Sequence, residues 1–107
     1  MNTKLIITAI LLALLSACGG VEKRAEKICS SMPAGASISN VEKILNEAGI
    51  TKLPPNPNHD DLYKNESYRT EPNYFIIVFP AFMTNRWVCQ VDFEQGKVTH
   101  HELRFVD

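Results

Sequence analysis

The spacing of apolar residues along the chain predicts two helices followed by a β-sheet. In residues 21–32 the apolar positions recur every three or four residues, which is the period of an amphipathic helix. They are Val21, Ala25, Ile28, Cys29 and Met32. Pro33 and Gly35 are expected to end this first helix, because neither residue favours continued helical geometry.

A second helix is predicted over residues 39–48. Ser39 and Glu42 have the spacing of a capping box, in which a hydroxyl and a carboxylate satisfy free amides of the first helical turn. The apolar face consists of Ile38, Val41, Ile44, Leu45 and Ala48. Gly49 follows this face and is expected to stop the helix in a left-handed conformation.

The last third of the chain has the composition and alternation of β-strands. Residues 74–79 form an aromatic and aliphatic run that predicts a central strand, and residues 67–70 predict a short edge strand. Residues 86–93 alternate, and Gly96 marks a hairpin before a last strand at 98–106. We therefore predict an α+β fold, with two N-terminal helices packed on one face of a three- to four-stranded antiparallel sheet.

Residues 51–73, between the second helix and the central strand, are polar and rich in proline and predict a long loop. Loops held on a rigid scaffold commonly carry binding residues, so we predict a partner-binding surface here and at the turn after Pro80. Its candidate residues are Asp60, Asp61, Tyr63, Tyr68, Phe82 and Met83. If the tyrosines instead belong to the core, the surface is expected on the outer sheet face. That face carries Arg86, Gln90, His100 and Arg104.

The first 17 residues have the layout of an export signal. Lys4 precedes an apolar run that is too short for a stable membrane-spanning helix, and small residues follow the run. Residues 18–20 then form an anchor and tether, and residues 21–107 form a single domain. The chain of 107 residues has a net charge of −1, which excludes a strongly basic surface for nucleic acid or anionic lipid.

The cleavage region, Leu15-Ser16-Ala17-Cys18, resembles the lipobox of bacterial lipoproteins. The resemblance implies that Cys18 receives a diacylglycerol, that the signal peptide is cut before it, and that the new amine is acylated, for example with palmitate. Gly19 stands where lipoproteins of the inner membrane typically carry Asp, which implies the periplasmic face of the outer membrane. An ordinary secretory signal with an accidental cysteine is the alternative.

Cys29 and Cys89 remain once Cys18 is acylated. The periplasm is oxidising, and two leftover cysteines in a small exported domain predict one disulfide. The periodicities support this pairing, because Cys29 lies on the apolar stripe of the first helix and Cys89 on the core side of a strand. A reactive thiol pair is the alternative, although the chain has no Cys-x-x-Cys motif.

No pattern in the sequence predicts catalysis. There is no Gly-x-Ser-x-Gly elbow and no glycine-rich phosphate loop. His100 and Glu102 share a strand face and, with His59 and Asp60, suggest part of a metal site, but polar residues are also ordinary at exposed strand positions. We therefore predict a non-enzyme that binds no metal and no cofactor.

The order of lipobox, two helices and antiparallel sheet is similar to that of outer-membrane lipoproteins of the SmpA/OmlA type, which are accessories of the barrel-assembly machinery and share a fold with β-lactamase-inhibitor proteins. The residues that carry the likeness are the capped segment 39–45 and the hairpin 91–98. The resemblance implies a non-catalytic, protein-binding accessory of envelope assembly. The alternative is a periplasmic inhibitor or immunity protein that blocks a toxin or hydrolase through acidic loop residues. Those residues are Asp60, Asp61, Glu66 and Glu71.

Overall fold

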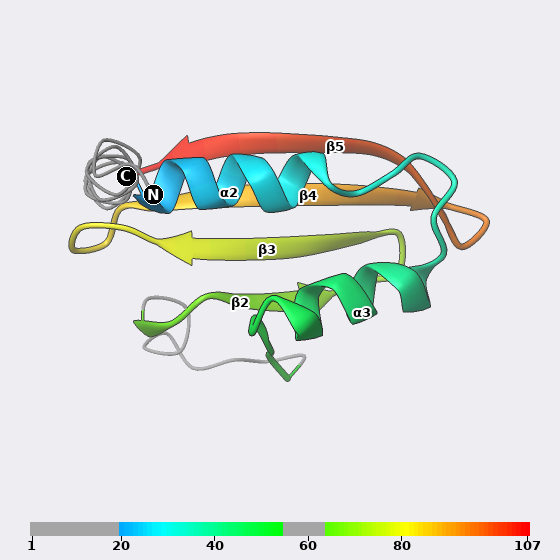
Figure 1. Cartoon of the computed structure of the whole chain (residues 1–107), viewed down its shortest axis with the longest axis horizontal. Coiled ribbons are helices and arrows are strands. Elements are labelled where there is room, and N and C mark those ends of the chain that lie inside the picture. Colours follow the sequence, from blue (N-terminus) through cyan, green and yellow to red (C-terminus); the bar gives the residue numbers. More distant parts are fainter. Residues whose placement is uncertain (1–19, 55–63) are drawn as a thin grey trace, which may run out of the picture.

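The computed structural model describes residues 20–54 and 64–107, which form a two-layer α+β structure (Figure 1). Helices α2 (Gly20–Ser30) and α3 (Ile38–Glu47) lie on the same face of one sheet. The strands are β1 (Thr51–Lys52), β2 (Ser67–Thr70), β3 (Tyr74–Pro80), β4 (Arg86–Glu94) and β5 (Lys97–Val106). The predicted fold class and the helices on one face are therefore confirmed.

The sheet differs from the prediction in having five strands and a mixed pairing. Its order is β1-β2-β3-β4-β5, with β1 parallel to β2 and the other neighbours antiparallel. The additional strand, β1, pairs Thr51 with Ser67 and Lys52 with Tyr68. A strand of two residues has no periodicity to detect, so this part of the chain was wrongly expected to belong to the loop.

Helix α3 begins one residue earlier than predicted and has a different cap. The side chain of Ser37, not that of Ser39, accepts a hydrogen bond from the amide of Asn40, at 3.2 Å. The reason lies in tertiary structure, since Ser37 forms an isolated bridge with Lys97 that holds it in an extended conformation before the helix. Gly49 ends the helix region with a φ of +79°, as predicted.

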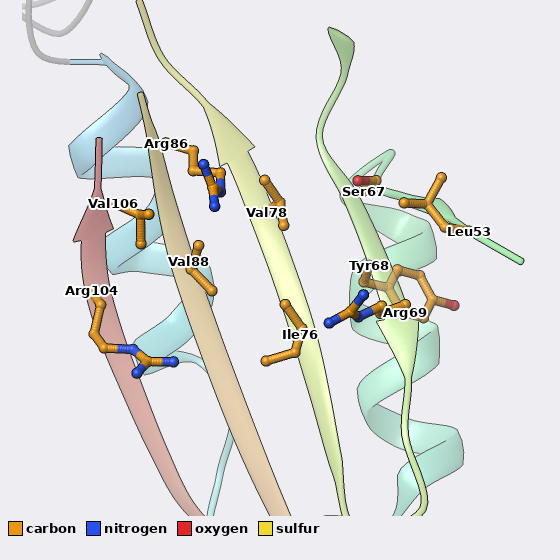
Figure 2. A pocket seen from close by; sticks show the side chains of 10 residues that line it. All are labelled: Leu53, Ser67, Tyr68, Arg69, Ile76, Val78, Arg86, Val88, Arg104 and Val106. Atoms are coloured by element: carbon orange, nitrogen blue, oxygen red, sulfur yellow. The ribbon is translucent and has the colours of Figure 1, made fainter. Parts of the chain in front are cut away.

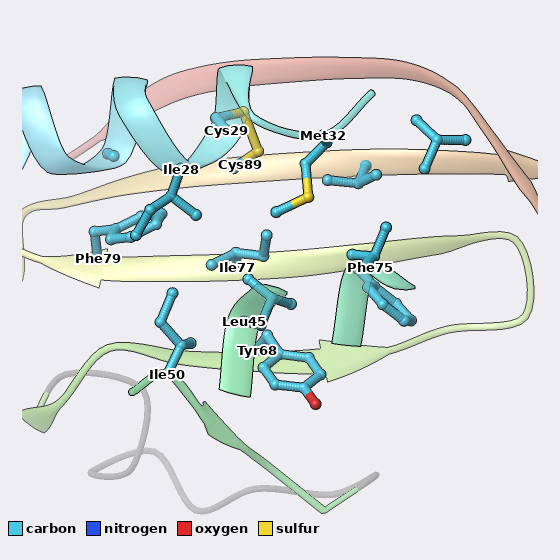
Figure 3. Close-up of a cluster of buried hydrophobic side chains, with 14 of the residues drawn as sticks. Ile28, Cys29, Met32, Leu45, Ile50, Tyr68, Phe75, Ile77, Phe79 and Cys89 are labelled. Carbon is cyan, nitrogen blue, oxygen red and sulfur yellow. A yellow bond between two sulfur atoms is a disulfide. The ribbon is translucent and has the colours of Figure 1, made fainter. Parts of the chain in front are cut away.

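The core lies between the two helices and the sheet (Figure 3). Phe75 contributes to it a ring that lies 5.7 Å from the ring of Tyr68 and 4.8 Å from the ring of Phe93. Each helix contributes the apolar stripe that its period predicts. The buried helix residues are Ala25, Ile28, Cys29, Val41 and Leu45.

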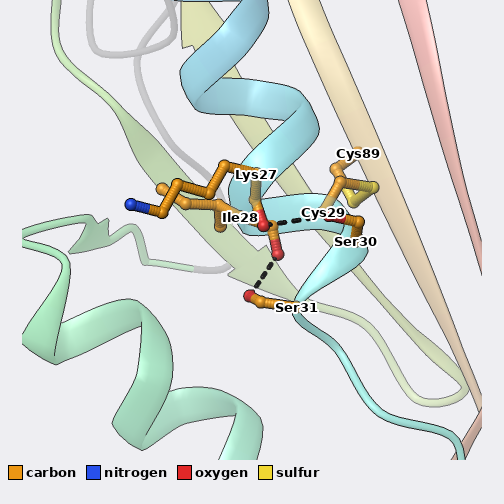
Figure 4. The surroundings of a disulfide bond; sticks show 6 residues. All are labelled: Lys27, Ile28, Cys29, Ser30, Ser31 and Cys89. Carbon is orange, nitrogen blue, oxygen red and sulfur yellow. Dashed lines mark hydrogen bonds between the residues drawn. A yellow bond between two sulfur atoms is a disulfide. The ribbon is translucent and has the colours of Figure 1, made fainter.

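A disulfide joins Cys29 of α2 to Cys89 of β4, with a Cα–Cα distance of 5.8 Å, which confirms the predicted pair (Figure 4). Helix α2 ends next to it at Ser30, and Ser31 Oγ donates to the carbonyl of Ile28 at 2.7 Å. The bond closes a segment of 60 residues, and a loop of that length corresponds to roughly 4 kcal/mol in the chain-entropy model. It fixes the helix layer to the middle of the sheet.

A β-bulge near the β4–β5 hairpin sets which residues of β5 face the helices. The register shifts between Asp92 and Phe93, so that Phe93 pairs with Val98 while Asp92 pairs with His100. Val98 therefore enters the core although His100, two residues later, faces away from it. Leu103 and Phe105 share the helix side of the sheet, because they pair with Cys89 and Trp87.

Candidate binding surface on the open face of the sheet

Alternate residues of β2 to β5 point away from the helices and form a second surface, which we call the open face. The register sets four rows across it, one of which is Tyr74-Asp92-His100. The other three rows are Arg69-Ile76-Gln90-Glu102, Ser67-Val78-Val88-Arg104 and Pro80-Arg86-Val106. Within residues 20–54 and 64–107 no helix covers this face, so its chemistry is set by the strands.

A groove of about 260 Å³ lies on the open face, and its floor is apolar (Figure 2). Ile76, Val78, Val88 and Val106 from three strands form this floor. Val78 and Val88 are only 6% and 8% exposed, although no described helix packs on them. Apolar side chains here are shielded by the charged side chains beside them, because long arginine stems can cover apolar surface.

Three arginines surround the groove: Arg69 from β2, Arg86 from β4 and Arg104 from β5 (Figure 2). Arg86 Nη1 donates to the carbonyl of Thr84 at 3.2 Å. Arg69 Nε lies 3.5 Å from a carboxylate oxygen of Glu71. The planar guanidinium group presents paired donors that match a carboxylate or phosphate. The groove thus combines an apolar floor with cationic hydrogen-bond donors.

Arg104 is linked to a short chain of polar side chains on the open face. Its Nη2 donates to Oε1 of Gln90 at 3.3 Å, and Nε2 of Gln90 donates to Oδ1 of Asp92 at 2.8 Å. The direct acceptor of Arg104 is therefore a neutral amide. The amide does not neutralise the positive charge of the Arg104 guanidinium, so this charge can attract an anionic group of a partner at the groove.

Two polar atoms of the groove are buried without a hydrogen-bond partner in the described part of the chain. They are Ser67 Oγ and Arg69 Nε. Native proteins pair nearly all such atoms, and an orphaned one costs about 1–3 kcal/mol. The Ser67 residue is 1% exposed, so bulk water does not satisfy its hydroxyl in this conformation. Arg69 Nε still faces the carboxylate of Glu71 in an ion pair, so Ser67 Oγ is the unsatisfied group. An unsatisfied hydroxyl beside an apolar floor is the arrangement expected where a ligand supplies the missing partner.

Tyr68, a predicted partner-binding residue, lies in the core and is 1% exposed, so the prediction that it contacts a partner is wrong. Alternation along β2 turns its ring toward α3, where its hydroxyl donates to Glu42 Oε2 at 3.3 Å. Burial raises the pKa of Tyr68, and the charge of Glu42 and this hydrogen bond raise it further. The residue is structural, and its hydroxyl is satisfied at the edge of the core.

The other predicted site residues fall into two groups. Cys18, Asp60, Asp61 and Tyr63 lie outside the described residues. Phe82 and Met83 lie on the turn between β3 and β4 and are 76% and 77% exposed, so they are surface residues rather than core residues. The structure places them at the end of the sheet, beyond the groove that β2 to β5 form.

Sequence reasoning named the outer sheet face only as a second choice. Its four residues, Arg86, Gln90, His100 and Arg104, do share the open face, and Gln90 and Arg104 are in contact. It missed Ser67 and Arg69, along with the apolar floor. A signal for the floor was present in the unbroken apolar run 74–79, since a strand that does not alternate is apolar on both faces.

In the described ranges no three histidine, cysteine, aspartate or glutamate residues gather closely enough to hold a metal ion. His100 shares the open face with Glu102, whereas His59 and Asp60 lie outside those ranges. None of the helices in residues 20–54 and 64–107 has the length and apolar character needed to cross a membrane.

Comparison of the chain with protein-family models, with curated proteins and with solved structures found no match. The fold and the open face are therefore interpreted from their own residues. They define a small disulfide-linked α+β protein with one helix-covered face and one face that carries a cationic, apolar groove.

Proposed function

We propose that this chain is a non-catalytic lipoprotein, anchored through Cys18 to the periplasmic side of the outer membrane, that binds a protein partner on its open face. The observation that supports the binding role is the groove, where three arginines surround an apolar floor and Ser67 Oγ has no partner. Arginine is enriched at protein interfaces, and the buried centre of an interface is more apolar than the rest of the surface. The partner we propose presents an acidic side chain flanked by apolar residues.

An accessory role in envelope assembly is the form of this proposal that agrees with the lipobox and with the likeness to SmpA/OmlA-type lipoproteins. The inhibitor alternative depends on an acidic surface directed at a cationic active site. Two of its four carboxylates are described, and both pair within the chain: Glu66 with Arg24, and Glu71 with Arg69. A groove lined by arginines complements an acidic partner rather than a basic one, which favours the accessory role.

The anchor is tested by Cys18→Ser. We expect this variant to lose acylation and to appear as an unprocessed or soluble form, since three acyl chains are what would hold the wild type on the bilayer. The measurement is fractionation of envelopes together with mass spectrometry of the N-terminal peptide. A cleaved Cys18→Ser protein that still fractionates with the outer membrane contradicts the lipoprotein assignment.

The binding face is tested by site-specific photo-crosslinking in living cells. A photoreactive residue replaces Glu102, which is exposed on the open face and leaves all three arginines in place. The matched control replaces Lys43, which is exposed on α3 at the other side of the molecule. We expect a protein adduct from position 102 only, and we expect Arg104→Glu to weaken that adduct at least tenfold by reversing the charge beside the groove.

The identity of the adduct separates the two functions. Components of barrel assembly support the accessory role, and a single toxin or hydrolase supports the inhibitor. An adduct that forms from position 43 but not from position 102 contradicts binding at the open face.

A further inference from the structure

The exposed large apolar side chains of the described chain lie together at one end of the sheet. They are Val21, Phe82, Met83 and Phe105. The end is defined by the register, which pairs Pro80 with Arg86 and Arg86 with Val106. Figure 1 shows the start of α2, the turn between β3 and β4 and the end of β5 on the same side of the molecule. We call this the apolar end.

The turn at the apolar end is closed by hydrogen bonds that direct two large side chains outward. The amide of Ala81 donates to the carbonyl of Asn85 at 2.9 Å, and the amide of Asn85 donates to the carbonyl of Phe82 at 3.0 Å. Met83 has a φ of +59°, a conformation that residues with side chains seldom adopt. Such conformations are concentrated at functional sites. Phe82 and Met83 are thus displayed by a fixed turn.

The opposite end of the sheet has a different composition. Its turns join β4 to β5 and β2 to β3, and they contain charged residues, amides, glycine and proline. Their residues are Glu94, Gln95, Gly96 and Lys97 in the first turn and Glu71, Pro72 and Asn73 in the second. A monomer exposes scattered apolar residues without consequence, but a cluster confined to one end indicates a contact surface.

The apolar end is also the end at which the proposed lipid anchor joins the domain. Helix α2 begins at Gly20 on this side, and Cys18 lies two positions earlier in the sequence. Two residues of chain span at most about 7 Å. An acylated Cys18 therefore brings the apolar end close to the bilayer surface, within reach of the boundary between headgroups and acyl chains.

We propose that Phe82 and Met83 insert into the bilayer that holds Cys18, so that the domain stands on the membrane with its apolar end down and its polar turns away from it. This inference rests on the lipid anchor of the proposed function. Burial of apolar side chains in the interfacial region adds to membrane affinity in proportion to the area buried. The acyl chains retain the protein, and the turn fixes its orientation, which leaves the open face accessible from the side.

The test is fluorescence quenching by brominated lipid. Phe82→Trp and the control Glu94→Trp are each made in a Trp87→Phe background, so that every protein contains one tryptophan. The lipidated proteins are reconstituted into phosphatidylethanolamine–phosphatidylglycerol vesicles with brominated acyl chains, and flotation measures how much protein is bound. We expect the emission of the F82W protein on vesicles to lie at a wavelength about 10 nm shorter than that of the same protein without vesicles. Brominated lipid is expected to quench this emission at least twofold relative to unbrominated lipid. The emission of the E94W protein is expected to stay unchanged in both comparisons.

The outcomes are separable. F82W protein that floats with the vesicles but is quenched no more than E94W protein overturns the insertion of the turn and leaves the anchor standing. Protein that does not float overturns the anchor and the inference together. A photoreactive residue at position 82 that forms a protein adduct in cells, combined with no quenching in vesicles, assigns the turn to a protein partner and overturns the membrane contact.

Discussion

The two faces of the sheet are formed by the same strands but differ in what covers them. On the covered face, Phe75, Ile77 and Cys89 are at most 1% exposed and pack under α2 and α3. On the open face, the intervening residues Ile76 and Val88 lie next to arginine side chains instead of a helix. Strand β3 is apolar toward both sides, so the difference lies in the neighbouring elements rather than in β3 itself.

This comparison separates packing from binding. The covered face holds tilted and edge-on ring pairs and a disulfide, with no orphaned polar atom among its described residues. The open face keeps the buried Ser67 hydroxyl without a hydrogen-bond partner, and an unsatisfied hydroxyl lowers stability as long as no ligand bonds to it. Packing therefore accounts for the residues of the covered face, whereas the proposed binding role is what would account for those of the open face.

The largest expected difference between the faces comes from truncating neighbours on β3. Phe75→Ala removes a ring that is 1% exposed and packs on Phe93, and we expect a loss of about 3–5 kcal/mol in the free energy of unfolding. Ile76→Ala, one residue later on the open face, is the matched control and is expected to lose at most about 1.5 kcal/mol. Denaturant unfolding measures both. Equal losses would show that the open face is part of the core.

The disulfide provides the next test, because it fixes the covered face to α2. Replacing Cys29 and Cys89 together by serine is expected to remove about 4 kcal/mol of stability and to lower the melting temperature by at least about 10 °C. The control is a reductant, which is expected to lower the melting temperature of the wild type but not that of the double variant. A wild type insensitive to reductant would mean that the bond contributes nothing.

Much of the covered face could be predicted from the sequence, because its signals are local and repeated. The helical stripe that ends at Met32 and the alternation through Cys89 each span several residues, and together they supported the disulfide that the two remaining cysteines predicted. The glycines at positions 49 and 96 marked two of the chain reversals, where φ is positive. Such periodicity predicts the structure well because each helix or strand buries its apolar side in the core.

The features that sequence reasoning missed depend on contacts between distant segments. Strand β1 is only two residues long and exists through its pairing with β2. The cap at Ser37 depends on its bridge to Lys97, 60 positions later in the chain. Tyr68 follows a polar segment, yet its side of β2 faces α3. The groove needs residues from four strands, so no single stretch of sequence contains it.

Two serines give a smaller contrast between satisfied and unsatisfied hydroxyls. Ser67 Oγ has no partner on the open face, so we expect Ser67→Ala to leave stability unchanged or to raise it by about 1 kcal/mol. Ser37 caps α3, and Ser37→Ala is expected to lower stability by about 1 kcal/mol. Thermal unfolding of the two variants measures the difference. A destabilised Ser67→Ala protein would indicate that the hydroxyl is already satisfied in the unliganded domain.

The smallest effect concerns Tyr68, whose hydroxyl bonds to Glu42 at the edge of the covered face. At neutral pH Tyr68→Phe is expected to cost less than about 1 kcal/mol, because one exchangeable hydrogen bond is lost while the ring stays in place.

The distinguishing result is its pH dependence. The folded state raises the pKa of Tyr68 above the ordinary value of 10.0, through burial first and then through Glu42. The folded protein therefore holds this proton more tightly than the unfolded chain does, so the contribution is present in full below about pH 10 and is lost as the pH rises through the folded pKa. Melting temperatures between pH 8 and about pH 11 are expected to fall more steeply for the wild type than for Tyr68→Phe. If the melting temperatures of the two proteins fell in parallel with pH, the tyrosine hydroxyl would be in contact with water and would not belong to the covered face.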